Sequence, residues 1–194
     1  MKTNKSVHEL FQVLRDLDPF STIWLKPRLF PKGKILMEVG DTCHHLYLIE
    51  KGVMRAYQLR EHTDITTWMV ADGNIACVTD SFLLGIPSSV GLETLETLEN
   101  TWAYSISFEQ YRVIRDYNNL TASLVISLLE DYLIHTQQRI ELFRYHSVDE
   151  RIGHYLKQPT SLFCRVPDRY IATYLGTTES TFSKCLKRVL DEMK

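Results

Sequence analysis

The sequence predicts an α+β fold in which an antiparallel β domain precedes a helical C-terminal part. Three observations lead to this prediction. Residues 23–106 contain short apolar or alternating runs, separated by turn-forming pairs such as Gly40-Asp41 and Asp72-Gly73, and this pattern is typical of a sandwich or barrel. Neither Pro nor Gly occurs from 108 to 147, which predicts one long helix, or two helices that meet near Asn118-Asn119. The remaining residues have the pattern of short helices separated by turns.

Length and composition indicate a globular protein of one large or two small domains. The 194 residues are 44% hydrophobic and 24% charged, which is enough apolar material for a core. The longest stretch without a charged residue runs from 117 to 129, and a membrane helix needs roughly 18 residues. Charged residues interrupt the first hydrophobic segment, so we expect no signal peptide, no membrane contact and a cytoplasmic protein. Ser6 and Glu9 have the spacing of a helix-capping pair, which predicts a short opening helix over 6–17.

The cysteines form no recognisable metal or disulfide framework. Cys43, Cys77, Cys164 and Cys185 are widely separated and form no CxxC pair. The sequence therefore predicts four independent thiols, each filling a small apolar space. We expect no metal and no cofactor.

An apolar seam runs along the predicted long helix. Its members follow one another at intervals of three or four residues: Val125, Leu129, Tyr132, Thr136, Ile140 and Phe143. A helix of this length extends beyond a small domain, so its far end requires a partner, and a symmetric homodimer is the simplest one. The alternative is packing on the chain's own β domain, which we expect for Leu124 and Leu128 on the neighbouring face.

The segment from 166 to 186 predicts two short helices joined by a tight turn. Pro167 and Asp168 suit the first turn of a helix, and Gly176 suits the left-handed residue that ends it. Thr178 offers a hydroxyl that caps the second helix. The apolar faces of the two helices are formed by Ile171, Ala172 and Leu175 and by Phe182 and Leu186. This is the spacing of a helix-turn-helix that places its second helix in the major groove of DNA.

An ordinary helical hairpin is the alternative interpretation of this segment. DNA binding is favoured because Lys184, Lys187 and Arg188 cluster on the second helix and a predicted dimerisation helix lies upstream. The C-terminal part is also the more basic one. Residues 147–194 carry 8 Lys or Arg and 6 Asp or Glu, whereas residues 1–146 carry 14 and 18.

Two blocks of sequence carry a resemblance that covers nearly the whole chain. The first contains Phe30-Pro31-Lys32-Gly33, Val39-Gly40-Asp41 and the run 46–53, and the second is the run 171–184. They resemble the sensor roll and the reading head of the cyclic-AMP receptor protein and fumarate-nitrate reduction regulators, the Crp/Fnr family. The resemblance implies a cyclic-nucleotide-binding-like antiparallel β-roll, or double-stranded β-helix, over 1–110. A dimerisation helix over 111–146 and a winged helix-turn-helix over 147–194 would follow.

The same resemblance implies a homodimeric transcription regulator that reads a near-palindromic operator in double-stranded DNA. It leaves RNA polymerase and a small-molecule effector open as further partners. The sensor region departs from the members that bind cyclic nucleotides, whose cassette runs from Gly-Glu to Arg-Ser. This chain has Gly73-Asn74 and no Lys or Arg between Arg60 and Arg112, an interval that holds eight acidic residues. A buried phosphate needs a cationic partner, so we infer that cyclic AMP is not the effector.

Other sensing chemistry of the family is equally hard to transfer. Its oxygen sensors gather cysteines near the N-terminus to hold an iron-sulfur cluster, whereas the first cysteine here is Cys43. The effector is therefore an uncharged ligand, or there is none.

The second helix of the motif departs from the family pattern as well. The family often places Glu directly before Thr and Arg after Ser, but here Ser180 stands in the first position, Glu179 lies one residue earlier and Lys184 replaces Arg. Lys cannot make the paired contact of Arg with guanine, so the family's operator does not transfer. Our hypothesis assigns the predicted DNA contacts to three groups. The residues expected to contact bases are Ser180, Ser183 and Lys184. The residues expected to contact phosphates or to hold the helix in register are Thr178, Arg169, Lys187 and Arg188. Glu179 and Thr181 complete the predicted DNA-binding set. Any wing comes from residues 161–166.

Two other functions fit parts of the sequence. A cupin-like metal-dependent enzyme would use His44, His45 and Glu50 as ligands, but neighbouring residues of a strand point to opposite faces, so both histidines cannot enter one barrel. No Ser-His-Asp set or Gly-rich phosphate loop is recognisable, and we expect no enzyme. The third possibility is a sensor dimer that does not bind DNA.

Overall fold

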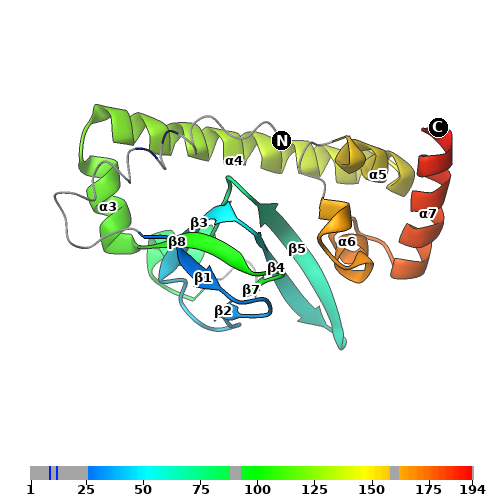
Figure 1. Cartoon of the computed structure of the whole chain (residues 1–194), viewed down its shortest axis with the longest axis horizontal. Helices are drawn as coiled ribbons and strands as arrows, with labels where there is room; N and C mark the ends of the chain where they lie inside the picture. The colour runs from blue at the N-terminus through cyan, green and yellow to red at the C-terminus, as the bar shows by residue number, and fades with distance from the viewer. Residues whose placement is uncertain (1–8, 10–11, 13–25, 88–92, 158–161, 194) are drawn as a thin grey trace.

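Two antiparallel sheets of four strands each form the N-terminal part of the protein (Figure 1). The computed structural model describes residues 9, 12, 26–87, 93–157 and 162–193, and the predicted opening helix over 6–17 lies almost entirely outside them. The strands are β1 (Arg28–Phe30), β2 (Ile35–Met37), β3 (His45–Lys51), β4 (Val53–Arg60), β5 (Thr63–Ala71), β6 (Ile75–Ala76), β7 (Thr94–Thr97) and β8 (Thr101–Ser107). Their orders are β1-β8-β3-β6 and β2-β7-β4-β5. Facing sheets that exchange strands in this way are typical of a jelly roll.

The two sheets enclose the first hydrophobic core. Leu48, Ile49 and Leu95 are completely buried there. Successive side chains of a strand point to opposite faces. On β4, Met54 therefore enters this core, whereas Val53 belongs to a second core outside the sheet.

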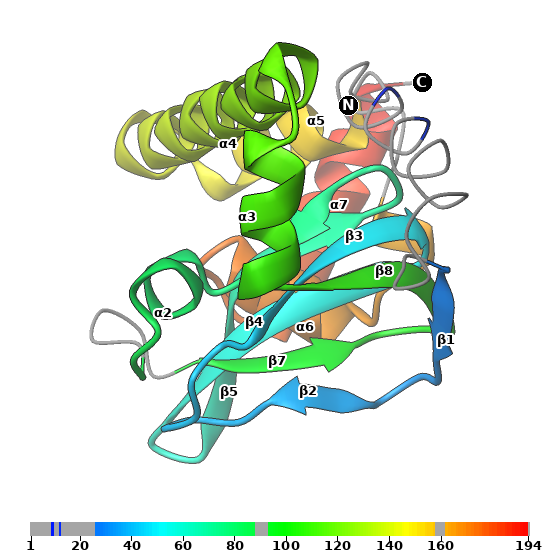
Figure 2. The ribbon, with the colours of Figure 1, turned by 90° about the vertical axis from the view of Figure 1, so that its left-hand side faces the viewer.

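The helices follow in the order that the sequence predicts. They are α2 (Thr79–Leu84), α3 (Phe108–Asp116), α4 (Asn119–Tyr145), α5 (Val148–Leu156), the 3₁₀ helix η2 (Leu162–Cys164), α6 (Asp168–Tyr174) and α7 (Glu179–Glu192). Figure 2 shows α3 meeting the end of the long helix α4 at an angle. Among the described residues, no helix is both long and apolar enough to cross a membrane.

The break between α3 and α4 has a local cause. Asn118 is extended, with φ of −163°, and its side chain accepts a hydrogen bond from the backbone N–H of Thr121, whose own side chain accepts one from the Asn118 N–H. Such a reciprocal cap satisfies amides that a helix start leaves unpaired. The sequence left open one long helix or two helices that meet near Asn118-Asn119. The structure confirms the second possibility.

The C-terminal helices pack around the second core and against the β domain. Ile152, Ile171, Ala172, Leu175 and Phe182 are buried there with side chains of the outer face of the sheet, namely Val53, Met69 and Ala71. The C-terminal helices are therefore not an independent domain joined by a linker, because residues of the helices and of the sheet share this second core.

The prediction of a wing over 161–166 is wrong for the residues of this stretch that the structure describes. Residues 162–164 form the 3₁₀ helix η2 instead of a strand. The backbone N–H groups of Arg165 and Val166 both donate to the carbonyl of Leu162, at 3.0 Å. These bonds close a compact turn that leads directly into α6, so no extended hairpin arm is available there.

Candidate nucleic-acid interface

The turn between α6 and α7 has the hydrogen bonds of a tightly closed helix end. Gly176 has φ of +72°, the N–H of Gly176 donates to the carbonyl of Thr173 at 3.0 Å, and the N–H of Thr177 donates to that of Ala172 at 2.9 Å. This pair of bonds defines a Schellman end, in which glycine takes the left-handed position. The predicted role of Gly176 is confirmed.

The second helix of the motif starts at the predicted cap. The Thr178 side chain accepts a hydrogen bond from the backbone N–H of Thr181 at 3.3 Å, which satisfies one of the free amides at the helix start. Phe182 is completely buried and Cys185 and Val189 nearly so. Leu186 is half-buried against the same core.

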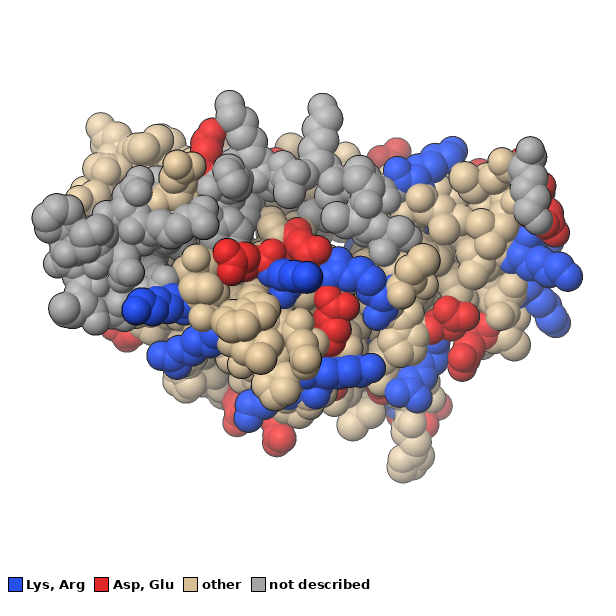
Figure 3. Space-filling model, in the orientation of Figure 1, with Lys and Arg blue, Asp and Glu red and all other residues tan. Residues whose placement is uncertain are grey.

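The face of α7 opposite to that core is exposed and polar. One residue turns a helix by about 100°, so Ser180, Ser183, Lys184 and Lys187 lie on the side turned away from Phe182. All four are exposed, and so are Thr178, Glu179, Thr181, Arg188 and, before α6, Arg169. Lys and Arg side chains gather at this end of the molecule (Figure 3). The shallow surface there is formed by Lys184, Lys187, Arg188, Asp191 and Glu192.

Two of the predicted phosphate ligands have partners within the chain. Arg188 forms an ion pair with Asp149 of α5 and also contacts the sulfur of Cys185. The Arg169 guanidinium donates to the hydroxyl of Tyr170 at 2.8 Å. Lys184 and Lys187 are therefore the cations of α7 that extend from its exposed face.

Arg151 of α5 holds the turn of the motif in place, a role that the sequence analysis missed. Its guanidinium donates to the carbonyl oxygens of Leu175 at 2.8 Å, His146 at 3.1 Å and Phe143 at 3.2 Å. It thereby joins the end of α4 to the end of α6. The acceptors are backbone atoms, so no side-chain pattern could have indicated this contact.

A buried cation of the β domain lies directly under α6. Arg55 of β4 is 1% exposed, pairs with Asp64 and Glu96 at 2.6 Å, and lies 3.5 Å below the ring of Tyr170. Beside it, the hydroxyl of Thr173 lies 3.2 Å from that of Thr66. The two acids and the aromatic face replace the water that the buried guanidinium has lost.

A second ionic contact joins the segment before α6 to the β domain. The Arg165 guanidinium donates to Asp72 at 2.9 and 3.0 Å and to Glu99 at 2.5 Å. Burial tends to raise the pKa of Asp72, but the hydrogen bonds from Arg165 and from the Gly52 amide outweigh it and hold the pKa below its usual value. The position of the helix-turn-helix is thus tied to the outer strands of the sheet.

Two members of the predicted α4 seam are covered within the single chain. Val125 is buried within its own chain, and Phe143 is half-buried next to Gly176 and Arg151. As expected, Leu124 is buried and Leu128 packs against the first core. Four apolar side chains of α4, Ile126, Leu129, Leu133 and Ile140, are exposed, and with the half-buried Thr136 they follow a 3-4-3-4 spacing that differs from the predicted one. Tyr132 is also exposed, and it lines a cavity together with Leu129 and Thr136.

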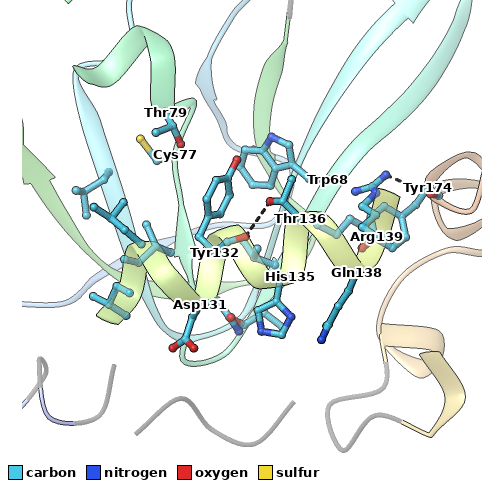
Figure 4. Close-up of a pocket in the computed structure, with 18 of the residues that line it drawn as sticks. Trp68, Cys77, Thr79, Asp131, Tyr132, His135, Thr136, Gln138, Arg139 and Tyr174 are labelled. Carbon is cyan, nitrogen blue, oxygen red and sulfur yellow. Dashed lines mark hydrogen bonds between the residues drawn. The ribbon is translucent and has the colours of Figure 1, made fainter. Parts of the chain in front are cut away.

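That cavity lies between the β domain, α4 and the C-terminal helices, with a volume of about 310 Å³. Trp68 of β5, Tyr132 and Thr136 of α4 and Tyr174 of α6 line it, and Figure 4 shows the Tyr132 ring extending from α4 toward Trp68. Most of the lining is apolar, and Arg139, which also lines it, is held over the Tyr174 ring at 4.2 Å.

The residues of the alternative metal site do not come together. His44 is exposed just before β3, His45 is half-buried at its start and Glu50 is exposed near its end. Among the described residues, no three His, Cys, Asp or Glu side chains form a group that could hold a metal ion.

Comparison with known proteins gives the fold. No protein-family model matches the sequence, and no curated protein matches it at a significant level. Among solved structures, a protein from Eubacterium rectale assigned to the Crp/Fnr family of transcriptional regulators is 21% identical, with a TM-score of 0.66 over 99% of this chain and 89% of that one. FixK2 from Bradyrhizobium japonicum is 15% identical, with a TM-score of 0.68 over 88% and 86%.

A third similar structure is a cyclic nucleotide-binding domain containing protein from Listeria monocytogenes. It is 16% identical, with a TM-score of 0.68 over 95% of this chain and 91% of that one. The likeness therefore extends over the β domain, the long helix and the C-terminal helices together. The chain has the α+β fold of the Crp/Fnr transcriptional regulators.

Proposed function

We propose that this protein is a DNA-binding transcription regulator of the Crp/Fnr type, acts as a homodimer and is not an enzyme. The observation that carries the proposal is the exposed face of α7. Ser180, Ser183, Lys184 and Lys187 extend from a helix whose other face is buried. The helix start is capped and its preceding turn is fixed. A rigid helix with short polar side chains and lysines on its free face suits insertion into the major groove.

The contacts of α7 divide by reach and chemistry. Ser180 and Ser183 are short and can approach base edges closely, and Lys184 can donate to guanine oxygen or nitrogen. Lys187, one turn further along, reaches toward phosphate. Arg188 forms an ion pair with Asp149. Arg188 would have to break this ion pair before it could contact a phosphate.

The homodimer would form along the outer face of α4. The spacing of Ile126, Leu129, Leu133, Thr136 and Ile140 is the a/d repeat of a two-helix coiled coil. Each of the leucines and isoleucines is about half exposed in the single chain. A second copy of α4 would cover them and place two α7 helices on the same side, as a two-fold operator requires.

The effector, if one is used, would be an apolar and uncharged molecule in the cavity beside α4. The cavity is lined mainly by aromatic and aliphatic side chains, and the sequence supplies no cation between Arg60 and Arg112. A cyclic nucleotide would bring a phosphate into this mainly apolar space, where the lining residue Arg139 is already held over the Tyr174 ring.

A selection from a random duplex library with the purified full chain tests the proposal. We expect enrichment of an inverted repeat whose half-sites are one helical turn apart. On that operator, Lys187→Ala should weaken binding to all sequences alike and reduce the slope of log K against log salt concentration by about one unit. Lys51→Ala, at an exposed position of the β domain, is the matched loss of charge and should leave the slope unchanged. A library that emerges without an enriched motif would favour a sensor dimer that does not bind DNA.

A further inference from the structure

A buried arginine of the β domain contacts two tyrosine rings from distant parts of the chain. The central guanidinium carbon of Arg55 lies 4.3 Å from the ring centroid of Tyr57, on the same strand, and 3.5 Å from that of Tyr170 on α6. Both carboxylate oxygens of Asp64 on β5 accept from its terminal nitrogens, at 2.6 and 2.7 Å, and Glu96 on β7 accepts from its Nε at 2.6 Å. Three strands therefore fix the plane of the guanidinium.

This flat cation gives α6 a directional contact with the sheet. A ring loses the attraction of a cation when it slides out from over it. A second contact lies close by, because Thr66 accepts from Arg55 at 2.9 Å and its backbone N–H donates to the Thr173 hydroxyl oxygen at 3.1 Å. Tyr170 and Thr173 are three residues apart, so both lie on the face of α6 that meets the sheet.

The other end of α6 is attached to α4 and α5 instead of to the sheet. Arg151 donates to the carbonyl oxygen of Leu175 at 2.8 Å, and Arg139 donates to that of Tyr174 at 3.4 Å. Leu175 follows Tyr170 at a distance of about 7.5 Å along the helix. A helix attached at one end only can swivel about that end, whereas two attachments at this separation fix its direction.

The apolar contacts between α6 and the sheet supply attraction but little direction. Ile171 and Ala172 share the second core with Val53 and Met69, and the attraction between apolar surfaces depends on the area covered. An apolar side chain at position 55 would extend this core without the cost of burying a charge. The stability of the core therefore does not explain the presence of Arg55, whereas the direction of α6 does.

We propose that Arg55, acting through Tyr170, is a positioning residue that fixes the direction of α6 and α7 relative to the β domain. The closed turn at Gly176 makes α7 follow α6, and Leu128 packs α4 against the first core. In a dimer built on α4, the Arg55 contact would thus also fix the separation of the two α7 helices. This last step rests on the proposed function above, and its consequence is one accepted spacing between the half-sites of the operator.

The direction of α7 is measured first in the full-length protein without DNA. Ketone-bearing amino acids replace Lys51 of the β domain and Leu190 of α7, which are both exposed, and carry spin labels without use of the native cysteines. An excess of unlabelled chain restricts the measured distances to one chain. Pulsed electron spin resonance should give one narrow distance distribution for the wild type. In the double variant Tyr170→Leu/Thr173→Val, which keeps apolar bulk but loses the ring face and the hydroxyl, its width should at least double.

Tyr170→Phe is the matched control for the double variant. It keeps the ring over Arg55 and loses only the hydroxyl that accepts a hydrogen bond from Arg169, so its distribution should be as narrow as that of the wild type. Thermal unfolding shows whether the double variant is folded, and Thr173→Val alone repeats the measurement if it is not. A folded variant with the same width as the wild type would overturn the proposal.

Operators whose half-sites are moved by one base pair then test the consequence for DNA. This change displaces a half-site by roughly 3.4 Å, so the wild type and Tyr170→Phe should lose about tenfold or more in affinity, and the double variant about threefold at most. An equal loss in the wild type and the double variant would contradict a role of Arg55 in spacing. If the distance distribution broadens as expected but the wild type binds no duplex, the positioning role stands and the proposed DNA-binding function fails.

Discussion

At the scale of single residues, Gly176 is the position where backbone and packing demands coincide. Its φ of +72° lies in the left-handed region, which costs an L side chain about 1 kcal/mol. A Cβ added there would also come within 2.9 Å of the Phe143 ring. Phe143 comes from the end of α4, and its carbonyl oxygen is bound by Arg151. The turn of the helix-turn-helix is thus shaped by the preceding helix as well as by its own sequence.

Gly176→Ala should therefore destabilise the protein by about 2 kcal/mol, the sum of a strained backbone and a displaced ring. Gly85→Ala is the matched control, because Gly85 has a similar φ of +68° and open space around the added Cβ. We expect it to show the backbone cost alone. Chemical denaturation of both variants measures the difference. If both variants lost the same free energy of unfolding, the contact between the added Cβ and Phe143 would contribute nothing to the destabilisation.

At the scale of elements, the sequence predicted the type and order of the helices better than their rotation. The spacing of Gly, Pro and capping residues is local information, and it located the two helices on either side of Asn118 and the turn at Gly176. The direction of the α4 seam depends on which face the β domain covers, and that is decided by distant residues. Val125 and Ile126 are adjacent and both apolar, so only tertiary packing could show that the first is buried and the second exposed.

The rotation of α4 gives a sharp test of the dimer. Leu133 and Ile134 are adjacent, apolar and similarly exposed, at 57% and 53%, but only Leu133 has the 3-4 spacing with Ile126, Leu129 and Ile140 of the proposed interface. Leu133→Glu would bury two like charges in a symmetric interface and should weaken dimerisation at least a hundredfold. Ile134→Glu should leave it nearly unchanged. Sedimentation equilibrium measures both constants, and equal effects of the two variants would exclude this seam as the interface.

At the scale of the whole molecule, the helix-turn-helix is held against the β domain by contacts between distant parts of the sequence. Arg165 reaches Asp72 and Glu99, and Tyr170 covers Arg55. The sequence analysis did not find these contacts, because a single charged residue carries no signal about a partner many residues away. These contacts set the orientation of α7 relative to the cavity.

The ionic part of this contact should make stability depend on pH. The pKa of Asp72 is lowered in the folded protein, so the carboxylate contributes stability above its unfolded pKa of about 3.9, and this contribution is lost as pH falls through the lower folded value. Asp72→Asn should therefore have a lower Tm than the wild type near pH 7, and the gap should narrow below about pH 4. Glu50→Gln, an exposed carboxylate of β3, controls for the loss of one surface charge. Thermal unfolding across this pH range measures the gap. A gap that stays constant down to acid pH would show that the loss of stability in Asp72→Asn does not come from the charge of the carboxylate.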